Sequence, residues 1–244
     1  MKYKKNIKVT VAMPAYNAAN YIQETIESVL SQDYEEFELL IIDDCSKDKT
    51  WDIMQKYKRH LRVRLSRNKI NFGVGKTRNK LVGLALGEYI TPCDADDIML
   101  QGNLKRHSIF LDNNPKYGAV YSDMLVLEIN NNNVMKRPPY IAELEKDLEW
   151  DLVQNLVNHA GSMIRKDLIR KVNGYNETVY SIDDWDLWLK LAEITKIKYL
   201  QGEIYYVWRK HPKGLTRTDK KWKQDYIIIM KEAVKRRYGL GSIS

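Results

Sequence analysis

Strand-like and helix-like segments alternate through the first hundred residues, and this alternation constrains the fold more than any other feature. Four apolar runs are typical of strands: 7–13, 37–44, 61–66 and 88–94. Between them, 19–31 and 74–86 have the apolar period of helices. Strands that alternate with helices form a mostly parallel sheet covered on both faces, and ligands bind beyond the carboxyl ends of its strands. We therefore predict an α/β fold with a binding edge at "MPAYN", "IIDDCS" and "CDADD".

The second half of the chain is less regular. Four further segments have strand or helix patterns: 119–129, 143–158, 183–194 and 197–209. The polar, turn-rich stretch 128–140 is expected to be a loop connection. Because the sequence has neither an internal repeat nor a clear linker, we expect one domain over 1–244. A nucleotide-binding-like half, 1–100, would be joined to a second half, 101–244, that completes the site.

The composition is that of a basic globular protein. The 244 residues carry a formal net charge of +8, which favours anionic partners: nucleic acid, acidic lipid headgroups or phosphorylated small molecules. Two cysteines, and no apolar run near the ~20 residues of a membrane span, indicate a reducing, cytoplasmic location. The basic stretch 220–241 is predicted to be a helix. This helix either packs on the domain or lies on anionic lipid at the inner face of a membrane.

The acidic motif "DAD" (94–96) comes directly after the fourth predicted strand. Alternate residues of an extended segment point the same way, so two carboxylates can converge on one cation, and oxygen ligands suit Mg²⁺ or Mn²⁺. Asp97 is expected to point away and to cap the next segment. Alone, the motif favours a solvated acidic loop, because such short matches arise often by chance. A calcium EF-hand is excluded, because Ile98 and Met99 stand where that loop needs Asp or Asn and Gly.

Two other acidic groups lie at the ends of predicted elements. Asp43 and Asp44 come after a buried strand. They are either a solvated strand end that helps to cap the next helix or an acidic pair similar to the phospho-acceptor pocket of receiver domains. Asp183 and Asp184 begin a predicted helix, where the helix dipole stabilises acids. The functional alternative is a general base beside the ring of Trp185, with a pKa raised by burial or by neighbouring acids.

Two basic motifs are candidates for phosphate binding. The sequence "GVGKT" (73–77) is not a P-loop, because Ile70 stands where that motif needs glycine. His211 lies in the stretch "RKHPK", which either is a surface loop or closes over a phosphate group.

Taken in order, these segments resemble the family-2 inverting glycosyltransferases, which have the GT-A fold. The resemblance covers nearly the whole chain and is strongest from Val9 to Asp97. "VTVAMPAYN" and "IIDDCS" are similar to the family's opening unit, and "NFGVGKTRN" with "GEYITPCDADD" to the next unit. "DDWDLWLKLA" and "HPKGLT" match the acceptor-binding half. Each motif is weak alone, but their joint order and spacing are highly specific.

The resemblance implies a role for each matching residue. Seven residues would bind the nucleotide sugar: Pro14, Ala15, Tyr16, Asp44, Arg78, Asp94 and Ala95. Asp96 and His211 would hold Mn²⁺ or Mg²⁺, and Asp184 would be the catalytic base. Three residues would support the site or contact the acceptor: Asp183, Trp185 and His159. Asp183 stands where the family usually has Glu, which leaves its role open.

The implied partners are a nucleotide sugar, with UDP favoured, and a glycan or lipid-linked acceptor; nucleic acid is not expected. Arg209 or Lys210 would help to stabilise the leaving diphosphate. Two alternatives stay open. A nucleotidyltransferase uses a similar sheet but usually has a Gly-rich basic signature, which "MPAYNAANY" lacks. A non-catalytic nucleotide-sugar or glycan-binding module is disfavoured because all the acidic motifs and the late histidine are present.

Overall fold

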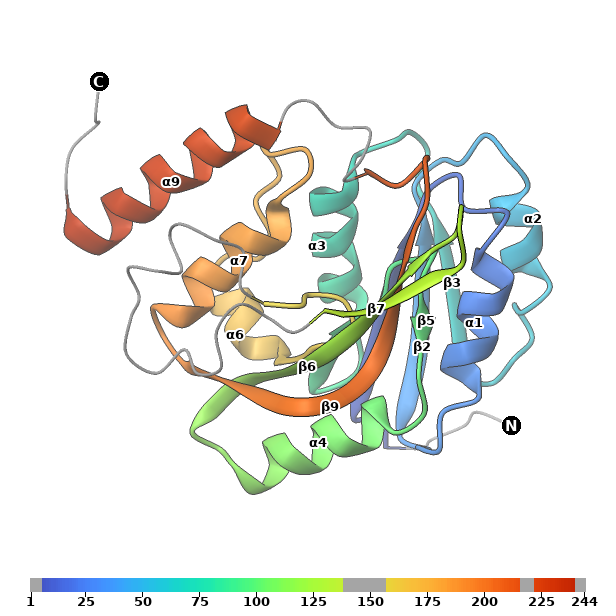
Figure 1. The fold of residues 1–244 in the computed structure, drawn as a ribbon, viewed down its shortest axis with the longest axis horizontal. Coiled ribbons are helices and arrows are strands. Elements are labelled where there is room, and N and C mark those ends of the chain that lie inside the picture. Colours follow the sequence, from blue (N-terminus) through green and yellow to red (C-terminus); the bar gives the residue numbers. More distant parts are fainter. Residues whose placement is uncertain (1–5, 138–156, 216–221, 240–244) are drawn as a thin grey trace.

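The computed structural model describes residues 6–137, 157–215 and 222–239, which form one mixed sheet with helices on both faces (Figure 1). In chain order the elements are β1 (Val9–Ala15), α1 (Ile22–Leu30), β2 (Phe37–Asp43), α2 (Thr50–Gln55), β3 (Val63–Arg67), α3 (Val74–Leu84), β4 (Tyr89–Pro92), β5 (Ile98–Met99), α4 (Asn103–Asn113), β6 (Tyr117–Glu128), β7 (Asn133–Arg137), β8 (Met163–Arg165), α6 (Lys166–Lys171), α7 (Asp183–Ala192), β9 (Lys196–Lys210) and α9 (Trp222–Tyr238). The strand order is β3-β2-β1-β4-β8-β6-β9-β5, and β7 pairs with β6. The predicted α/β fold is confirmed.

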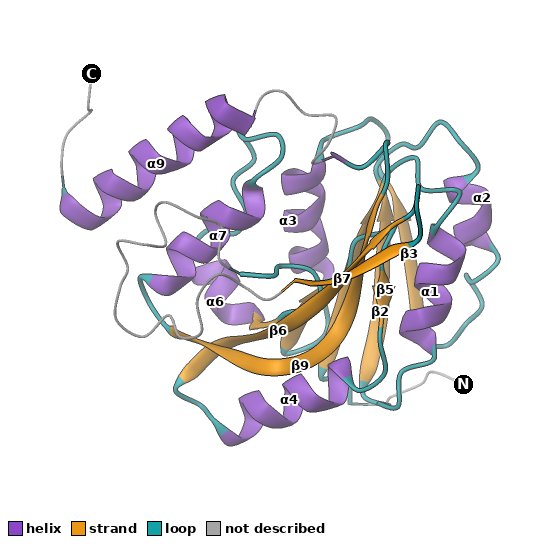
Figure 2. Cartoon of the chain, in the orientation of Figure 1, coloured by secondary structure: helices purple, strands orange, loops and turns teal. Residues whose placement is uncertain are grey.

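Strand β2 illustrates why helices cover both faces of the sheet. All seven of its residues are buried. Leu39 and Ile41 belong to the apolar layer that includes α1, whereas Leu40 and Ile42 pack in the layer that includes α3 and α7. Figure 2 shows α1 and α2 on one side of the sheet and α3, α6 and α7 on the other. Because successive side chains of a strand point to opposite faces, the unbroken apolar run 39–42 is stable only where both faces are buried.

The predicted binding edge also forms. Strand β1 pairs in parallel with β2, where Ala15 lies opposite Asp43, and with β4, where Ala12 lies opposite Pro92. Parallel strands place their carboxyl ends at the same edge of a sheet. The segments that come after β1, β2 and β4 therefore meet there, as the sequence predicts.

Two parts of the second half differ from the prediction. Residues 133–137, expected to be part of a loop, form β7, which pairs antiparallel with β6 after a tight turn at Asn132, whose φ is +52°. Pairing with β6 provides partners for backbone groups of this polar stretch, so a strand forms without an apolar pattern. The short strand β5 and the helix α4 were not predicted. Most of the helix predicted at 143–158 lies outside the described residues.

Helix α9 packs on α7 through a narrow face. Its buried residues, Asp225, Ile229 and Ala233, are four positions apart and therefore lie on one side of the helix. Trp222, the first residue of the helix, is 49% exposed. None of the helices in the described ranges combines the length with the apolar content that a membrane crossing requires.

Candidate active site

Asp44 organises the part of the edge that lies between β1 and β3. Its carboxylate is 4% exposed and accepts hydrogen bonds from the Asn68 amide at 2.7 Å and from the backbone N–H groups of Phe72 and Gly73 at 3.0 and 2.9 Å. Its backbone N–H donates to the Ala15 carbonyl at 2.8 Å. Two of the three side-chain bonds go to Oδ1 and one to Oδ2, so Oδ2 retains capacity for one further donor.

The turn after β1 offers one open aromatic surface beside Asp44. Tyr16 is 46% exposed and Pro14 is half-buried. Ala15, in contrast, is 1% exposed and belongs to the core, and its carbonyl is engaged by Asp44. Of the three turn residues, Tyr16 is therefore the one whose side chain is available to a planar ligand. Ala95 is also a core residue, and its carbonyl accepts a bond from the Thr25 hydroxyl.

The acidic motif after β4 is a turn rather than an extended segment. The Asp97 N–H donates to the Asp94 carbonyl at 3.2 Å and closes the turn. As a result Asp94 and Asp96 engage different partners: Arg78 binds Asp94, and His211 binds Asp96. Asp97 is 1% exposed and accepts the backbone N–H of Arg209 at 2.9 Å, instead of capping the next segment. Burial, and then the charges of Asp96 and Asp94, raise the pKa of Asp97 well above its ordinary value.

Arg78 joins this turn to the start of α7. Its guanidinium lies 3.0 Å from Asp94 Oδ1 and 2.9 Å from both oxygens of Asp183. The Arg78 side chain is 11% exposed and that of Asp183 only 1%, and the guanidinium lies 5.7 Å from the ring centre of Tyr175. We call Asp94, Arg78 and Asp183 the acid–arginine bridge. Asp183 is shorter than the Glu that the family usually has here, but both of its carboxylate oxygens reach Arg78. Its negative charge is therefore balanced by an arginine of the same chain.

Asp184 is the half-buried neighbour of the bridge. It is the second residue of α7, and its Oδ1 accepts the Trp185 N–H at 2.8 Å. Burial, and to a lesser extent the negative charge of Asp183, raises the pKa of Asp184 to about 6, although Arg78 acts in the opposite direction. A carboxylate with such a pKa is mostly ionised at neutral pH and basic enough to accept a proton from a hydroxyl group in a transition state.

Asp96 and His211 meet although they are 115 positions apart in the sequence. Asp96 Oδ2 lies 2.9 Å from His211 Nε2, and the His211 ring lies 4.5 Å from that of Tyr21. The His211 Nδ1 is buried and has no hydrogen-bond partner among the residues that the structure describes. A carboxylate and an imidazole together suit Mn²⁺ or Mg²⁺ as a partial ligand set. The described residues contain no group of three or more acidic, histidine or cysteine ligands, so such a cation would also need oxygens from substrate phosphates or water.

The two basic neighbours of His211 are bound within the protein. Arg209 is 4% exposed; its guanidinium binds the Asp96 carbonyl, the Glu24 carboxylate and, at 2.9 Å, the Thr25 hydroxyl. Lys210 lies 3.0 Å from Glu128. Arg209 therefore fixes the acidic turn on α1, and neither side chain projects freely toward a diphosphate in this arrangement.

Two of the predicted support residues belong to the packing behind the site. Trp185 is 9% exposed and its ring lies 5.4 Å from that of Tyr226 on α9. His159 is 5% exposed, and its Nε2 lies 3.3 Å from the Tyr175 hydroxyl, beneath Arg78. Burial, and then the charge of Arg78, keep the pKa of His159 well below its ordinary value. Neither ring is an open platform for a ligand; both support the bridge.

Several residues that shape the site have no local sequence signal. The Tyr206 hydroxyl accepts the Asp94 N–H at 3.1 Å from 112 positions away. Asp225 of α9 accepts the N–H groups of Tyr180 and Ser181, which lead into α7, at 2.8 and 3.0 Å. Contacts over such separations appear only once β9 and α9 are placed, so a single sequence does not reveal them.

Comparisons with known proteins agree with this architecture. The profile of the family described as "Glycosyl transferase family 2" matches residues 10–172. The putative glycosyltransferase EpsE of Bacillus subtilis is 29% identical over 236 residues, which are 94% of this chain and 82% of EpsE. The poly(ribitol-phosphate) β-N-acetylglucosaminyltransferase TarS of Staphylococcus aureus is 35% identical over 130 residues, which are 52% of this chain but 22% of TarS.

Two solved structures share the fold over nearly the whole chain. A crystal structure of S. aureus TarS residues 1–349 with UDP-GlcNAc superposes with a TM-score of 0.78 at 24% identity, covering 94% of this chain and 67% of that one. The mannosyltransferase PcManGT of Pyrobaculum calidifontis, with GDP-Man and Mn²⁺, gives a TM-score of 0.69 at 18% identity, covering 98% of this chain and 66% of that one. At these identities the likeness shows the fold, which is the GT-A fold.

The bridge generates a stability prediction. Replacing Arg78 by Met leaves Asp183 buried without a counter-charge, and breaking a buried ion pair on one side costs about 3 to 5 kcal/mol. Urea unfolding of Arg78→Met should show a loss of this size. The matched control is Arg106→Met, which removes a more exposed pair with Glu203 and should cost below about 1 kcal/mol. Equal losses in the two variants would contradict the importance of the bridge.

Proposed function

Because this chain belongs to glycosyl transferase family 2, we propose that it moves a sugar from a nucleotide sugar, most readily a UDP-sugar, to a hydroxyl group of a glycan or lipid-linked acceptor, with inversion at the anomeric carbon. The observation that carries the proposal is the arrangement of Asp184 beside the acid–arginine bridge. This arrangement links a weakly basic carboxylate to the acidic turn after β4 through Arg78.

In this proposal residues 1–100 bind the donor and residues 101–244 bind the acceptor. The Tyr16 ring would stack on the base, and the free capacity of Asp44 Oδ2 suits the N3–H of a pyrimidine. TarS, a relative of this chain, has been solved with UDP-GlcNAc, which supports a UDP donor; dTDP has the same N3–H. The transferred sugar would be a hexose or an N-acetylhexosamine.

Asp184 would act as the general base. The acceptor oxygen forms a bond to the anomeric carbon while the bond from that carbon to the diphosphate oxygen breaks, and the hydroxyl proton passes to the Asp184 carboxylate. A single displacement of this kind inverts the configuration, so a UDP-α-sugar would give a β-linkage. Asp183, which is locked to Arg78, would hold the start of α7 in place and raise the basicity of its neighbour.

Asp96 and His211 would hold Mn²⁺ or Mg²⁺, which would neutralise charge on the leaving nucleoside diphosphate. Arg78 would orient Asp94 toward the ribose and the diphosphate. The positive charge of Arg78 would be shared between the carboxylates of Asp94 and Asp183. Arg209, bound to the carbonyl of Asp96, would fix the direction of that carboxylate. PcManGT, a structural neighbour, has been solved with Mn²⁺, which supports a metal-dependent reaction.

We also propose that α9 contacts an anionic membrane surface. Its outer side exposes Ile227 by 53%, and Lys223, Lys231 and Lys235 on the same helix are exposed. Apolar side chains with lysines around them are typical of helices that lie in the interface of anionic bilayers. Such a contact would hold the enzyme near a lipid-linked acceptor.

The base assignment is tested by nucleotide release. With Mn²⁺ and a panel of UDP-, dTDP- and GDP-sugars, the wild-type protein should release nucleotide, and Asp184→Asn should lose about 10²- to 10⁴-fold in kcat. Its affinity for UDP should stay within about twofold, because the donor contacts remain. Asp167→Asn, at the exposed start of α6, is the matched control and should retain full activity. Release at wild-type rate by Asp184→Asn would refute the assignment.

The pH profile tests the electrostatic argument. Since Asp184 acts as a carboxylate with a pKa of about 6, kcat/KM should fall about tenfold per pH unit below that value and level off above it. Asp183→Asn removes a charge that raises this pKa, so the acidic limb should move to lower pH. In Asp167→Asn the limb should not move. A limb that stays in place in Asp183→Asn would contradict the coupling.

Membrane contact is tested by flotation with lipid vesicles. The protein should float with phosphatidylcholine vesicles only when they contain phosphatidylglycerol, and less at high salt. Replacing Lys231 and Lys235 by Ala should weaken binding by about 2 kcal/mol, roughly thirtyfold, because each lysine contributes about 1 kcal/mol. Ile109→Ser on α4, where the residue is 46% exposed, is the control for Ile227→Ser. Equal flotation with neutral vesicles would contradict the proposal.

A further inference from the structure

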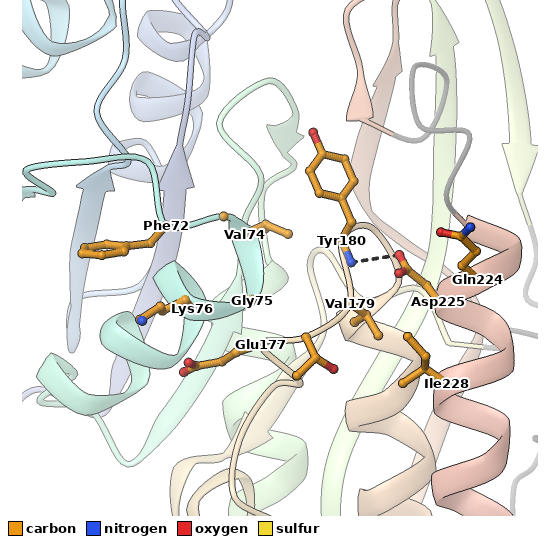
Figure 3. A pocket seen from close by; sticks show the side chains of 12 residues that line it. Phe72, Val74, Gly75, Lys76, Glu177, Val179, Tyr180, Gln224, Asp225 and Ile228 are labelled. Atoms are coloured by element: carbon orange, nitrogen blue, oxygen red, sulfur yellow. Dashed lines mark hydrogen bonds between the residues drawn. The ribbon is translucent and has the colours of Figure 1, made fainter.

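A cavity of about 360 Å³ lies between the start of α3, the segment 177–180 and the first turns of α9 (Figure 3). None of the predicted site residues lines it. Figure 3 shows the Tyr180 ring at its rim, Gln224 on the α9 side, and Val74 and Lys76 on the α3 side. Its volume falls at the lower end of the ~300–1,000 Å³ range of small-molecule sites.

The cavity adjoins the candidate catalytic residues. Gly75 forms part of its wall, and a Cβ atom placed on Gly75 would lie 2.6 Å from the Asn176 carbonyl oxygen and 3.5 Å from Asp183 Cβ. Gly75 therefore separates the cavity from the acid–arginine bridge. Tyr180 lies four positions before Asp184. The segment that bears the Tyr180 ring therefore leads to Asp184 at the start of α7.

The cavity is held in shape by a buried carboxylate. Asp225 of α9 is 5% exposed and accepts the N–H groups of Tyr180 at 2.8 Å and Ser181 at 3.0 Å; the bond to Tyr180 is drawn in Figure 3. These bonds fix the segment that presents the Tyr180 ring and leads into α7. The site is thus pre-organised on the helical scaffold rather than formed by a free loop.

The lining matches the chemistry of a saccharide. The Tyr180 ring is 51% exposed, and the side chains of Val74 and Ile228 add apolar surface suited to the C–H face of a sugar ring. Glu177 provides acceptor oxygens and Gln224 both a donor and an acceptor, which suits hydroxyl groups at the ring edge. A purely apolar ligand would leave these polar groups without partners. Besides Asp225, whose carboxylate is bound to backbone N–H groups, the lining carries one cation, Lys76, and one anion, Glu177, so a neutral polar ligand fits it better than a strongly charged one.

We propose that this cavity is an acceptor subsite that binds one saccharide unit of the glycan, adjacent to the unit whose hydroxyl meets Asp184. The inference rests on the proposed function, since it names where part of the acceptor is held. In this proposal Tyr180 and Gln224 determine which acceptors are used, and they do not bind the nucleotide.

Saturation-transfer NMR tests the subsite without knowledge of the natural acceptor. The probes are four disaccharides (cellobiose, chitobiose, lactose and maltose), each with UDP present as an internal reference. At least one should receive saturation from the wild-type protein. In Tyr180→Ala its binding should weaken about two- to tenfold, the usual contribution of one aromatic contact. Tyr238→Ala, which removes a tyrosine that is 53% exposed outside the cavity, is the matched control and should bind as wild type does.

The outcomes separate the subsite from the enzyme activity. The subsite is refuted if no disaccharide binds the wild-type protein. It is also refuted if Tyr180→Ala and Gln224→Ala bind the disaccharide as tightly as Tyr238→Ala does. Either result counts against the subsite even where nucleotide release from UDP-sugars persists. If UDP-sugars release no nucleotide while a disaccharide still binds in a Tyr180-dependent way, the proposed function fails instead. In the variants, hydrolysis of the donor by water should keep the wild-type rate, because no donor contact is altered.

Discussion

The bidentate contact of Arg78 with Asp183 is the interaction on which the rest of the site depends. Two carboxylates from elements 89 positions apart share one nearly buried guanidinium. Neither this guanidinium nor Asp183, whose side chain is 1% exposed, would be stable there alone, whereas the Asp94 side chain is 38% exposed. The bridge ties the turn after β4 to the start of α7, so the acidic motif and Asp184 are held in one rigid frame. It also sets the electrostatics, since Asp183 raises and Arg78 lowers the pKa of Asp184.

The position of the site can be predicted from the sequence more directly than its geometry. Continuous apolar strands such as 37–43 require a sheet buried on both faces, and parallel pairing then brings Asp44 and the motif at 94–96 to one edge. The internal shape of that motif was not predictable. The prediction of an extended segment was wrong, because the Asp97 N–H closes a turn on Asp94 and the Asp97 carboxylate is drawn inward by the backbone of Arg209.

Residues of one type in the same neighbourhood take different roles because of their long-range partners. Arg209 and Lys210 have the chemistry to neutralise a diphosphate. However, Arg209 forms an ion pair with Glu24, and Lys210 forms one with Glu128. Trp185 and His159 are buried in the packing behind the frame, in contact with Tyr226 and Tyr175 respectively. Strand β7 formed in a stretch with no apolar pattern, because pairing with β6 determined its conformation. Each of these outcomes depends on contacts that local composition does not encode.

The two roles proposed for helix α9 fall on different sides of it, and this separation is a consequence of its helical geometry. Residues four apart share a face, so Asp225, Ile229 and Ala233 point inward, where Asp225 fixes the segment before Asp184. Ile227, Lys223, Lys231 and Lys235 are exposed on the other side of the helix, whereas Ile228 lies at its flank and lines the cavity. A lipid surface that attracts the outer face therefore need not displace the inner face. The cavity beside Tyr180 would then lie close to the membrane, where a lipid-linked glycan is presented, and membrane binding and acceptor choice can be altered independently by substitutions on the two faces.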